Sequence, residues 1–596
     1  MFQSFEVTSR PEQGPPRLAD LRVELAREGL DGFLIPRADA HQGEYVSARD
    51  ERLSWLTGFT GSAGFCAALI DIAGVFIDGR YRTQVKSQVA SDFTPVAWPE
   101  VSLAEWLIEH LPEGGKIGFD PWLHTVAQID RARDALAGSD IALIGCDNLI
   151  DRIWADQPQP AMLPASAHPL EFAGEAHTDK CNRLAAALVK ADQSAAVITL
   201  PDSVCWLLNI RGADIPRNPI AQGFAVLNAD ASVDLFMQSA KTKGLEGHLG
   251  ERVRVHQLSE FLAFVSSLTG AVRLDKTSAP VIVADALGDV AVWADDPCAL
   301  PKACKNAAEI AGSAEAHLRD GAAVVELLAW LDAQEVGSLS ETQVVSKLES
   351  FRRRDNALKD ISFETIAGTG PNGAIMHYRV TTDTDSTLED GHLIVLDSGG
   401  QYLDGTTDIT RTIAIGTPPN EARAAFTRVL LGMIAMSRLR WPTGLAGRDI
   451  EMIGRLPLWM AGQDFDHGLG HGVGAYLSVH EGPQRLSRVS TVPLQAGMIL
   501  SNEPGYYREG AFGIRIENLI VVTDAPSLEG GDDHRAMLNW RTLTFAPIDR
   551  HLIVAEMLDN DSRAWLNAYH AETYERLAPR VSPETAIWLS DATRSI

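Results

Sequence analysis

The sequence predicts two similar α/β domains followed by an α+β domain. A helix pattern over residues 17–29 leads into the apolar strand "GFLIP" at 32–36. A second helix and strand of the same pattern begin near residue 180, in "RLAAALVKADQSAAVITLP". Strand patterns then dominate residues 361–415 and 498–523. This order indicates a duplicated front part and a different architecture in the last part of the chain.

A further pair of similar segments supports the duplication. The segment "LSWLTGFTG" at 53–61 has a counterpart in "VCWLLNIRG" at 204–212. The offset between the two copies is smaller at this pair than at the helix–strand pair before it, so we expect a longer loop in the first copy. Two unrelated helix–strand pairs remain the alternative to a duplication.

Proline-rich stretches separate these parts. The segment "WADQPQPAMLPAS" at 154–166 has the proline density of a linker, and "DPCALPKACKN" at 296–306 is a second break. A long helix pattern follows, with apolar residues at three- and four-residue intervals up to Leu331. The tail from about residue 540 has helical and aromatic content, so we expect it to be ordered. The predicted domains are residues 1–155, 156–305 and 306–530, with a C-terminal extension at 531–596.

The charge balance argues against several kinds of partner. The 596 residues include 52 basic and 79 acidic side chains, a net charge of −27. This disfavours nucleic acids and anionic membranes, which need a basic face. No apolar run reaches the roughly 18 residues of a membrane span, and the first residues lack the basic and apolar regions of a signal peptide. The six cysteines form no C-x-x-C pair, which is typical of a reducing compartment and predicts a cytoplasmic protein.

The segment "DHGLGHGVGAYLSVHEGP" at 466–483 combines three histidines with alternating glycines. His467 and His471 are four residues apart, as two zinc ligands on one helix face would be. A glycine at every second position is incompatible with a helix, because each costs roughly 1 kcal/mol relative to alanine. We expect instead that the glycines let the backbone pass close to metals and substrate and leave room around the imidazoles.

Four carboxylates stand on otherwise apolar strands in the same part of the chain. Asp397 ends "HLIVLD", Asp408 precedes the alternating strand "ITRTIAI", Glu503 ends "MILSNE" and Glu517 lies in "GIRIEN". Each one alone is most simply a turn or surface residue. Together they would meet a desolvation cost of several kcal/mol each if they were buried without partners.

Nearby basic residues are too few to pair with all four acids, since Arg411 and Arg515 are the obvious candidates. Two divalent cations would balance the four charges and leave a neutral imidazole, that of His471, as a further ligand. Oxygen ligands with one nitrogen suit Mn²⁺, with Zn²⁺, Co²⁺ or Fe²⁺ as alternatives. Such a pair of cations polarises a carbonyl and generates a bridging hydroxide near neutral pH, so the predicted chemistry is hydrolysis.

The order of these motifs resembles that of the pita-bread metallopeptidases. Two aspartates eleven residues apart are followed by the histidine of "HGLGHGVG" and by the glutamates of "NEPGYY" and "GIRIEN". Within that family, "GPNGAIMHY", "LDGTTDITRT" and the duplicated front part are similar to the three-domain aminopeptidase P group. The resemblance covers nearly the whole chain. It implies two creatinase-like N-terminal α/β domains followed by a pita-bread catalytic domain.

The resemblance also implies roles for individual residues. The implied metal ligands are Asp397, Asp408, His471, Glu503 and Glu517. Glu503 would also shuttle a proton, and His377 and His480, together with His471, would contact substrate and steady the tetrahedral intermediate. His467 is similar to a further active-site histidine, with a packing role as its alternative.

Arg80 is the one implied site residue from the first domain. It follows the strand and Asp-Gly turn of "VFIDGRYRT" at 75–83. There it resembles an arginine that contacts the peptide substrate, and a surface arginine is the alternative. A substrate contact of this kind would change KM more than kcat when removed.

The expected activity is that of an Xaa-Pro aminopeptidase, which removes the residue before a proline in second position. An X-Pro bond has no N–H, so a dedicated enzyme has to recognise the ring by its shape. A prolidase-like X-Pro dipeptidase and a non-catalytic peptide-binding protein on the same fold are the alternatives. The family resemblance also implies a homodimer.

Overall fold

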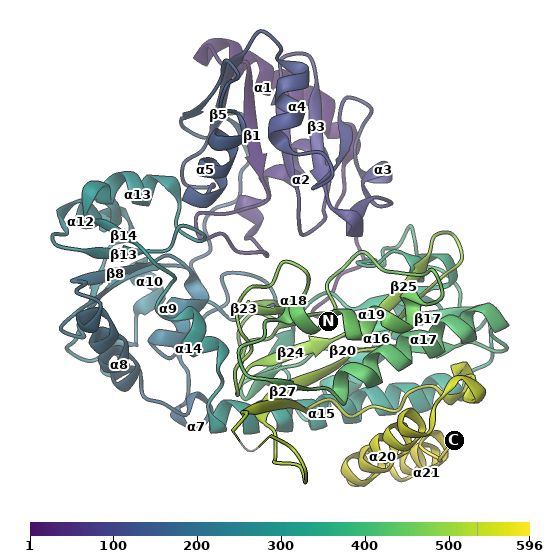
Figure 1. The fold of residues 1–596 in the computed structure, drawn as a ribbon. Coiled ribbons are helices and arrows are strands. Elements are labelled where there is room, and N and C mark those ends of the chain that lie inside the picture. The colour runs from purple at the N-terminus through teal and green to yellow at the C-terminus, as the bar shows by residue number, and fades with distance from the viewer. Residues whose placement is uncertain (533) are drawn as a thin grey trace. The chain divides into compact units, whose positions relative to one another are not determined.

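The computed structural model describes residues 1–532 and 534–596. It contains two compact units, which we treat separately (Figure 1). The N-terminal unit consists of Thr8–Leu170 and Glu175–Ala299. The C-terminal unit consists of Met1–Val7, Glu171–Gly174 and Leu300–Ile596.

The N-terminal unit holds two six-stranded sheets of the same topology. The first has the order β4 (Thr94–Ala97), β3 (Ala73–Ile77), β2 (Phe65–Leu69), β1 (Gly32–Pro36), β5 (Gly115–Phe119), β6 (Ile141–Gly145). The second has the order β12 (Val253–His256), β11 (Val233–Phe236), β10 (Phe224–Asn228), β8 (Ala195–Ile198), β13 (Val272–Leu274), β14 (Ala291–Trp293). The central strands β1 and β8 have equivalent neighbours. On one side of each, the next two pairs of strands are antiparallel and the pair at the sheet edge is parallel. On the other side, both pairs are parallel. The predicted duplication is confirmed.

The helices of the two sheets correspond as well. The matching pairs are α1 (Gly14–Glu28) and α8 (His177–Lys190), α2 (Arg52–Thr57) and α9 (Pro201–Leu207), α4 (Leu103–His110) and α12 (Phe261–Ser267), and α5 (Val126–Ala135) and α13 (Val281–Leu287). The two similar sequence segments are therefore α2 and α9. The loop from β1 to α2 spans residues 37–51, whereas only residues 199 and 200 separate β8 from α9. The longer loop in the first copy is also confirmed.

Helix α1 illustrates how these helices pack. Leu18, Leu21 and Leu25 recur at three- and four-residue intervals and are all buried. Such a stripe faces the core while the polar residues between its members stay at the surface. The helix ends at Gly29, whose φ of 65° is the left-handed conformation that glycine adopts at least cost.

The C-terminal unit is built around two sheets that supply the strand ends of the site. The three-stranded sheet has the order β16 (Ile366–Thr369), β17 (Leu393–Ser398), β20 (Ile409–Ala414). The six-stranded sheet has the order β21 (Arg440–Pro442), β28 (Met537–Thr542), β27 (Asn518–Asp524), β24 (Ile499–Asn502), β22 (Gly470–Gly472), β23 (Glu481–Leu486). This pairing of two sheets with helices is the expected α+β architecture.

Long helices cover these sheets. They are α15 (Ala307–Asp332), α16 (Glu341–Arg352) and α17 (Asn420–Ser437). The long helix predicted after residue 306 is thus α15, which Asn306 caps together with Glu309. Phe426 and Met433 of α17 belong to the same buried apolar cluster as Leu500 and Ile520 of the sheet.

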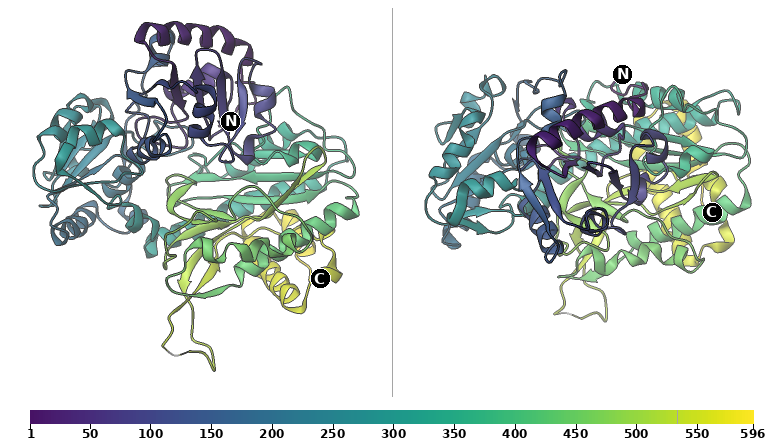
Figure 2. Two further views of the ribbon diagram at one scale, coloured as in Figure 1. Left: turned by 45° about the horizontal axis from the view of Figure 1, so that its top comes forward. Right: turned by 90° about the horizontal axis from the view of Figure 1, so that it is seen from above.

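The tail of the chain is ordered, as predicted. It contains β28, α20 (Asn560–Leu577) and α21 (Pro583–Ala592). Both views of the ribbon show these yellow helices next to α15 and α17 (Figure 2). Leu566 and Leu589 are buried in the same cluster as α17, and Trp588 donates a hydrogen bond to Asp332 (2.9 Å).

The first residues of the chain also belong to the C-terminal unit. The Phe2 amide donates to the Glu349 carboxylate (2.9 Å). Gln3 makes two reciprocal bonds with the backbone of Thr365, donating at 3.2 Å and accepting at 2.8 Å. The chain therefore leaves this unit after Val7, rejoins it briefly at Glu171–Gly174 and enters it for its remaining length at Leu300.

None of the helices in the described part of the chain combines the length and apolar character that a membrane crossing requires.

Candidate metal centre

Two of the four carboxylates lie side by side on neighbouring strands. Asp397 is in β17, and Asp408 immediately precedes β20. These strands pair antiparallel, with Asp397 opposite Thr410. Residues 408 and 410 point to the same side of β20, so the register brings the two carboxylates to one face.

The other two carboxylates leave the second sheet at a common point. Strand β24 ends at Asn502, directly before Glu503, and β27 begins at Asn518, directly after Glu517. Asn502 and Asn518 are partners in the antiparallel register. Glu503 and Glu517 therefore emerge together, at the end of the sheet that faces β20.

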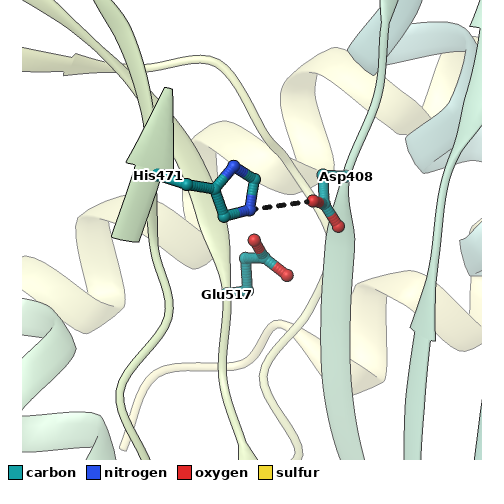
Figure 3. Close-up of side chains that lie close together, drawn as sticks. All are labelled: Asp408, His471 and Glu517. Carbon is teal, nitrogen blue, oxygen red and sulfur yellow. Dashed lines mark ion pairs between the residues drawn. The ribbon is translucent and has the colours of Figure 1, made fainter. Parts of the chain in front are cut away.

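His471 brings the imidazole to this group. It is the central residue of β22, and its Nε2 lies 3.5 Å from Asp408 Oδ2 and 3.5 Å from Glu503 Oε1. Asp408, His471 and Glu517 each offer one ligand atom within 4.8 Å of the others (Figure 3). Nδ1 of His471 lies 3.0 Å from the carbonyl oxygen of Gly472, an arrangement in which Nδ1 carries the proton and Nε2 is left for a metal.

Gly470 and Gly472 lie against the backbones of neighbouring strands, whereas the sequence analysis expected the glycines to lie against metals and substrate. A Cβ at Gly470 would lie 1.9 Å from the Ser501 carbonyl oxygen, and one at Gly472 would lie 2.2 Å from that of Glu481. The glycines thus allow β22 to pass tightly between its neighbouring strands. They are required by strand packing, and it is this packing that carries His471 to the carboxylates. The segment is not helical, as predicted.

Asp397, Asp408 and Glu517 are buried, Glu503 is half-buried, and several of the carboxylate oxygens have no hydrogen-bond partner. Among the described residues, Oδ1 of Asp397, Oδ1 of Asp408 and Oε1 of Glu517 are buried without a donor. Burial raises the pKa of Asp408 well above its usual range, and the charges of Asp397 and Glu503 add to the effect. Burial and the charges of Asp408, Glu503 and Asp397 raise the pKa of Glu517 well above its usual range. Buried oxygen acceptors whose charges repel one another are typical of a site that binds cations.

One arginine pairs with the site and the other does not. Arg515 donates to Asp397 Oδ2 (2.6 Å) and to the Tyr507 hydroxyl (2.5 Å). Arg411 instead donates to carbonyl, amide and phenol oxygens, such as the Glu517 carbonyl (2.7 Å), and it forms no ion pair with a described residue. The expectation that Arg411 is a charge partner of the acids is wrong. Of the two arginines, Arg515 alone offsets the negative charge of the cluster.

The three remaining histidines have different surroundings. The ring of His480 lies 4.3 Å from that of His471, at a steep angle. His467 contacts the Tyr507 hydroxyl through Nε2 (2.9 Å), and its Nδ1 lies 3.9 Å from Glu503 Oε2. His377 lies in the loop after the 3-10 helix η6 (Gly370–Ala374). Both His467 and His480 are thus at the cluster, and the substrate role of His377 stays a prediction.

Arg80 belongs to the N-terminal unit and is described within it. It lies in the 3-10 helix η3 (Gly79–Tyr81) that follows β3, and Asp78 caps this turn by accepting from the Arg80 amide (3.0 Å). The same carboxylate pairs with the guanidinium (2.7 Å). Asp78 therefore orients the Arg80 side chain, and its contact with a peptide stays a prediction.

The sequence analysis missed two hydroxyl groups that hold the acids. Thr410 donates to Glu517 Oε2 (2.7 Å), and Ser501 donates to Glu503 Oε1 (3.1 Å) while it accepts from the His471 amide (2.9 Å). Each lies two residues from an acid on the same strand face. The two-residue alternation of a strand was the signal that could have identified them.

The residues present fit a pair of divalent cations. Asp397, Asp408, Glu503 and Glu517 supply oxygen atoms, and His471 supplies one nitrogen. Hard divalent cations prefer this donor set, and the buried oxygens without donors would be satisfied by them. Held so, the cations would act on a carbonyl and a water molecule, which is the chemistry of hydrolysis.

Comparison with family models gives four matches along the chain. Residues 17–153 and 156–309 match models described as Creatinase/Prolidase N-terminal domain. Residues 311–524 match the model of Metallopeptidase family M24, and residues 536–596 match the C-terminal region of peptidase_M24.

Relatives cover the full length of the chain. The probable Xaa-Pro aminopeptidase P of Laccaria bicolor is 36% identical, over 96% of this chain and 91% of its own. Aminopeptidase P1 of Arabidopsis thaliana is 35% identical, over 97% of this chain and 99% of its own. Among solved structures, the X-prolyl aminopeptidase of Caenorhabditis elegans, described as a cytosolic enzyme with a di-nuclear active site, has a TM-score of 0.93 and 30% identity, covering 98% of this chain and 99% of that one.

The raised carboxylate pKa values predict how the metal-free protein responds to pH. The folded chain holds protons on Asp408 and Glu517 that the unfolded chain releases above about pH 4. Their contribution to stability is complete below that pH and is lost as the pH rises through the raised values. We expect the melting temperature of the metal-stripped chain to fall between pH 5 and 8, and to fall less in Glu517→Gln.

Thermal melts of the stripped wild type and variant across this range test the prediction. Glu575→Gln, which neutralises an exposed acid on α20, serves as the control and should follow the wild type. Equal slopes for wild type and Glu517→Gln would contradict the assignment of the raised pKa to the cluster.

Proposed function

Because the chain belongs to the aminopeptidase P group of metallopeptidase family M24, we propose that it is a metal-dependent Xaa-Pro aminopeptidase. It removes the N-terminal residue from peptides that have proline in second position. The observation that carries the proposal is the group of buried carboxylate oxygens without hydrogen-bond donors around His471. Divalent cations would satisfy these oxygens and offset their charges at the same time.

The proposed metal ligands are Asp397, Asp408, His471, Glu503 and Glu517. The convergence of their strands and the shortage of positive charge support the assignment. Mn²⁺ is the proposed metal because the set is rich in oxygen with a single nitrogen, and Zn²⁺ or Co²⁺ would also suit it.

When bound, two such cations would polarise the scissile carbonyl and lower the pKa of the attacking water. Glu503, whose pKa burial raises, is suited to hold the proton that the water gives up and to pass it to the proline nitrogen. His480, next to His471, and His377 would donate hydrogen bonds to the carbonyl oxygen as it gains charge. His467, between Tyr507 and Glu503, would hold the Glu503 carboxylate in place.

The substrate preference follows from the chemistry of the X-Pro bond. This bond is a tertiary amide, so its nitrogen offers no N–H for a general peptidase to recognise. A prolidase-like X-Pro dipeptidase is the second candidate, and the full-length match to aminopeptidase P relatives favours the first.

We also propose a cytoplasmic location and a homodimer. The six cysteines are all free thiols in the structure, as expected in a reducing compartment. The homodimer rests on the family relationship. Light scattering at micromolar concentration is expected to give about twice the 64.6 kDa mass of the chain, and a monomer mass would contradict the proposal.

Glu517→Ala is expected to leave a folded protein with less bound metal and almost no turnover. The substitution removes one carboxylate of the cluster, and loss of one ligand weakens the whole site. Elemental analysis and peptide hydrolysis measure the two effects. Full activity of the wild type after exhaustive chelation would exclude a metal centre.

Peptides of the type Arg-Pro-Pro are expected to lose their first residue, whereas the same peptides with alanine in second position are not. The prediction follows from recognition of the proline ring by shape. Mass spectrometry of the products gives the cleavage site. Equal rates on both peptides would indicate a general aminopeptidase, and cleavage of X-Pro dipeptides alone would indicate a prolidase.

A further inference from the structure

Arg411 occupies a buried position directly behind the metal centre. It lies in β20, three residues after Asp408, and is 2% exposed. It does not point at the carboxylates. Its acceptors are neutral oxygens of two groups of residues, one beside the candidate ligands and one in the C-terminal extension.

The first group holds the backbone that carries the ligands. Nη1 of Arg411 donates to the carbonyl oxygens of Thr410 and Glu517, both at 2.7 Å. Nη2 donates to Oδ1 of Asn518 (2.8 Å). Since the Glu517 amide also donates to the Thr410 carbonyl (3.1 Å), this corner joins the strand after Asp408 to the strand that begins beside Glu517.

The second group lies in the C-terminal extension. Nη2 donates to the Ala546 carbonyl (2.8 Å) and to the Tyr569 hydroxyl of α20 (2.8 Å), and Nε donates to the Pro547 carbonyl (3.1 Å). The Tyr569 hydroxyl in turn lies 3.3 Å from Oδ1 of Asn518. One guanidinium and one hydroxyl therefore connect the extension to the Glu517 carbonyl and to the adjacent Asn518.

This arrangement has a specific chemical requirement. A buried cation without a carboxylate partner is costly unless each of its donors finds an acceptor. The guanidinium has five N–H donors in a rigid plane, whereas a lysine has three on one atom. A lysine here could not reach all of these acceptors at once.

We propose that Arg411 is a positioning residue through which the C-terminal extension sets the placement of Glu517 and Asp408 for metal binding. The extension is then a structural part of the metal centre, although it contributes no ligand. The inference rests on the proposed metallopeptidase function.

Arg423 offers a matched control. It also connects the C-terminal extension to the rest of the C-terminal unit, because from α17 it donates to the carbonyl oxygens of His551 (3.0 Å) and Ile553 (3.1 Å). Among the described residues, its side chain forms no hydrogen bond with the strands of the candidate ligands. Arg423→Lys therefore disturbs the anchoring of the extension without touching the corner at Glu517.

The experiment is calorimetric titration of Mn²⁺ into the metal-stripped full chain, together with melts of stripped and Mn²⁺-loaded protein. We expect Arg411→Lys to bind Mn²⁺ at least about tenfold more weakly, as loss of an outer-shell partner typically does. Tyr569→Phe, a milder change, should bind about threefold more weakly, and Arg423→Lys should match the wild type. The rise in melting temperature that Mn²⁺ causes should shrink in the first two variants alone.

Wild-type affinity in Arg411→Lys and Tyr569→Phe would overturn the proposal, as would an equal loss in Arg423→Lys. A purely structural role would lower the melting temperatures of stripped and loaded protein by the same amount and would also overturn it. If Arg411→Lys does not fold, the affinity of Tyr569→Phe decides. A wild-type chain that binds no Mn²⁺ would instead refute the metal centre itself, a result distinguishable from all of these.

Discussion

Four carboxylates that face a common space, three of them buried and Glu503 half-buried, are the constraint on which the rest of the C-terminal unit depends. Acids at such short range repel one another, and removal from water disfavours the charge of each further. The raised pKa values of Asp408 and Glu517 express this cost. The surrounding elements have to hold the acids in place against it. The fold achieves this by placing each acid within one residue of the end of a strand that pairs with a neighbour.

Different chemical groups hold the individual residues of the metal site in place. Arg515 bonds Asp397 directly, hydroxyl groups of Thr410 and Ser501 bond Glu517 and Glu503, and Gly470 allows β22 to pack closely enough to deliver His471. All of these partners are short or rigidly placed. A centre held by such groups is organised before any ligand arrives, which lowers the cost of binding.

Much of this could be predicted from the sequence, because acids on apolar strands stand out against their surroundings. The duplicated sheets were predictable for a similar reason, since a helix and a strand recur in the same pattern. The partners of Arg411 could not be predicted. Tyr569 lies far from it in the sequence, and no local pattern distinguishes an arginine that pairs with an acid from one that binds carbonyl oxygens. The alternating glycines were noticed, but their reason depends on the strands that pack beside them, and only the structure identifies those.

The docking of residues 1–7 on the C-terminal unit has a consequence for synthesis on the ribosome. The partners of Phe2 and Gln3, Glu349 and Thr365, are made some 350 residues later. At 5–20 residues per second, this delay lasts roughly 20–70 s. During that time Phe2 and Gln3 lack their partners, whereas the N-terminal unit has its whole sequence once Ala299 has been made, before Glu349 and Thr365. Vectorial translation therefore delays the native contacts of residues 1–7 until residues 349 and 365 have been made.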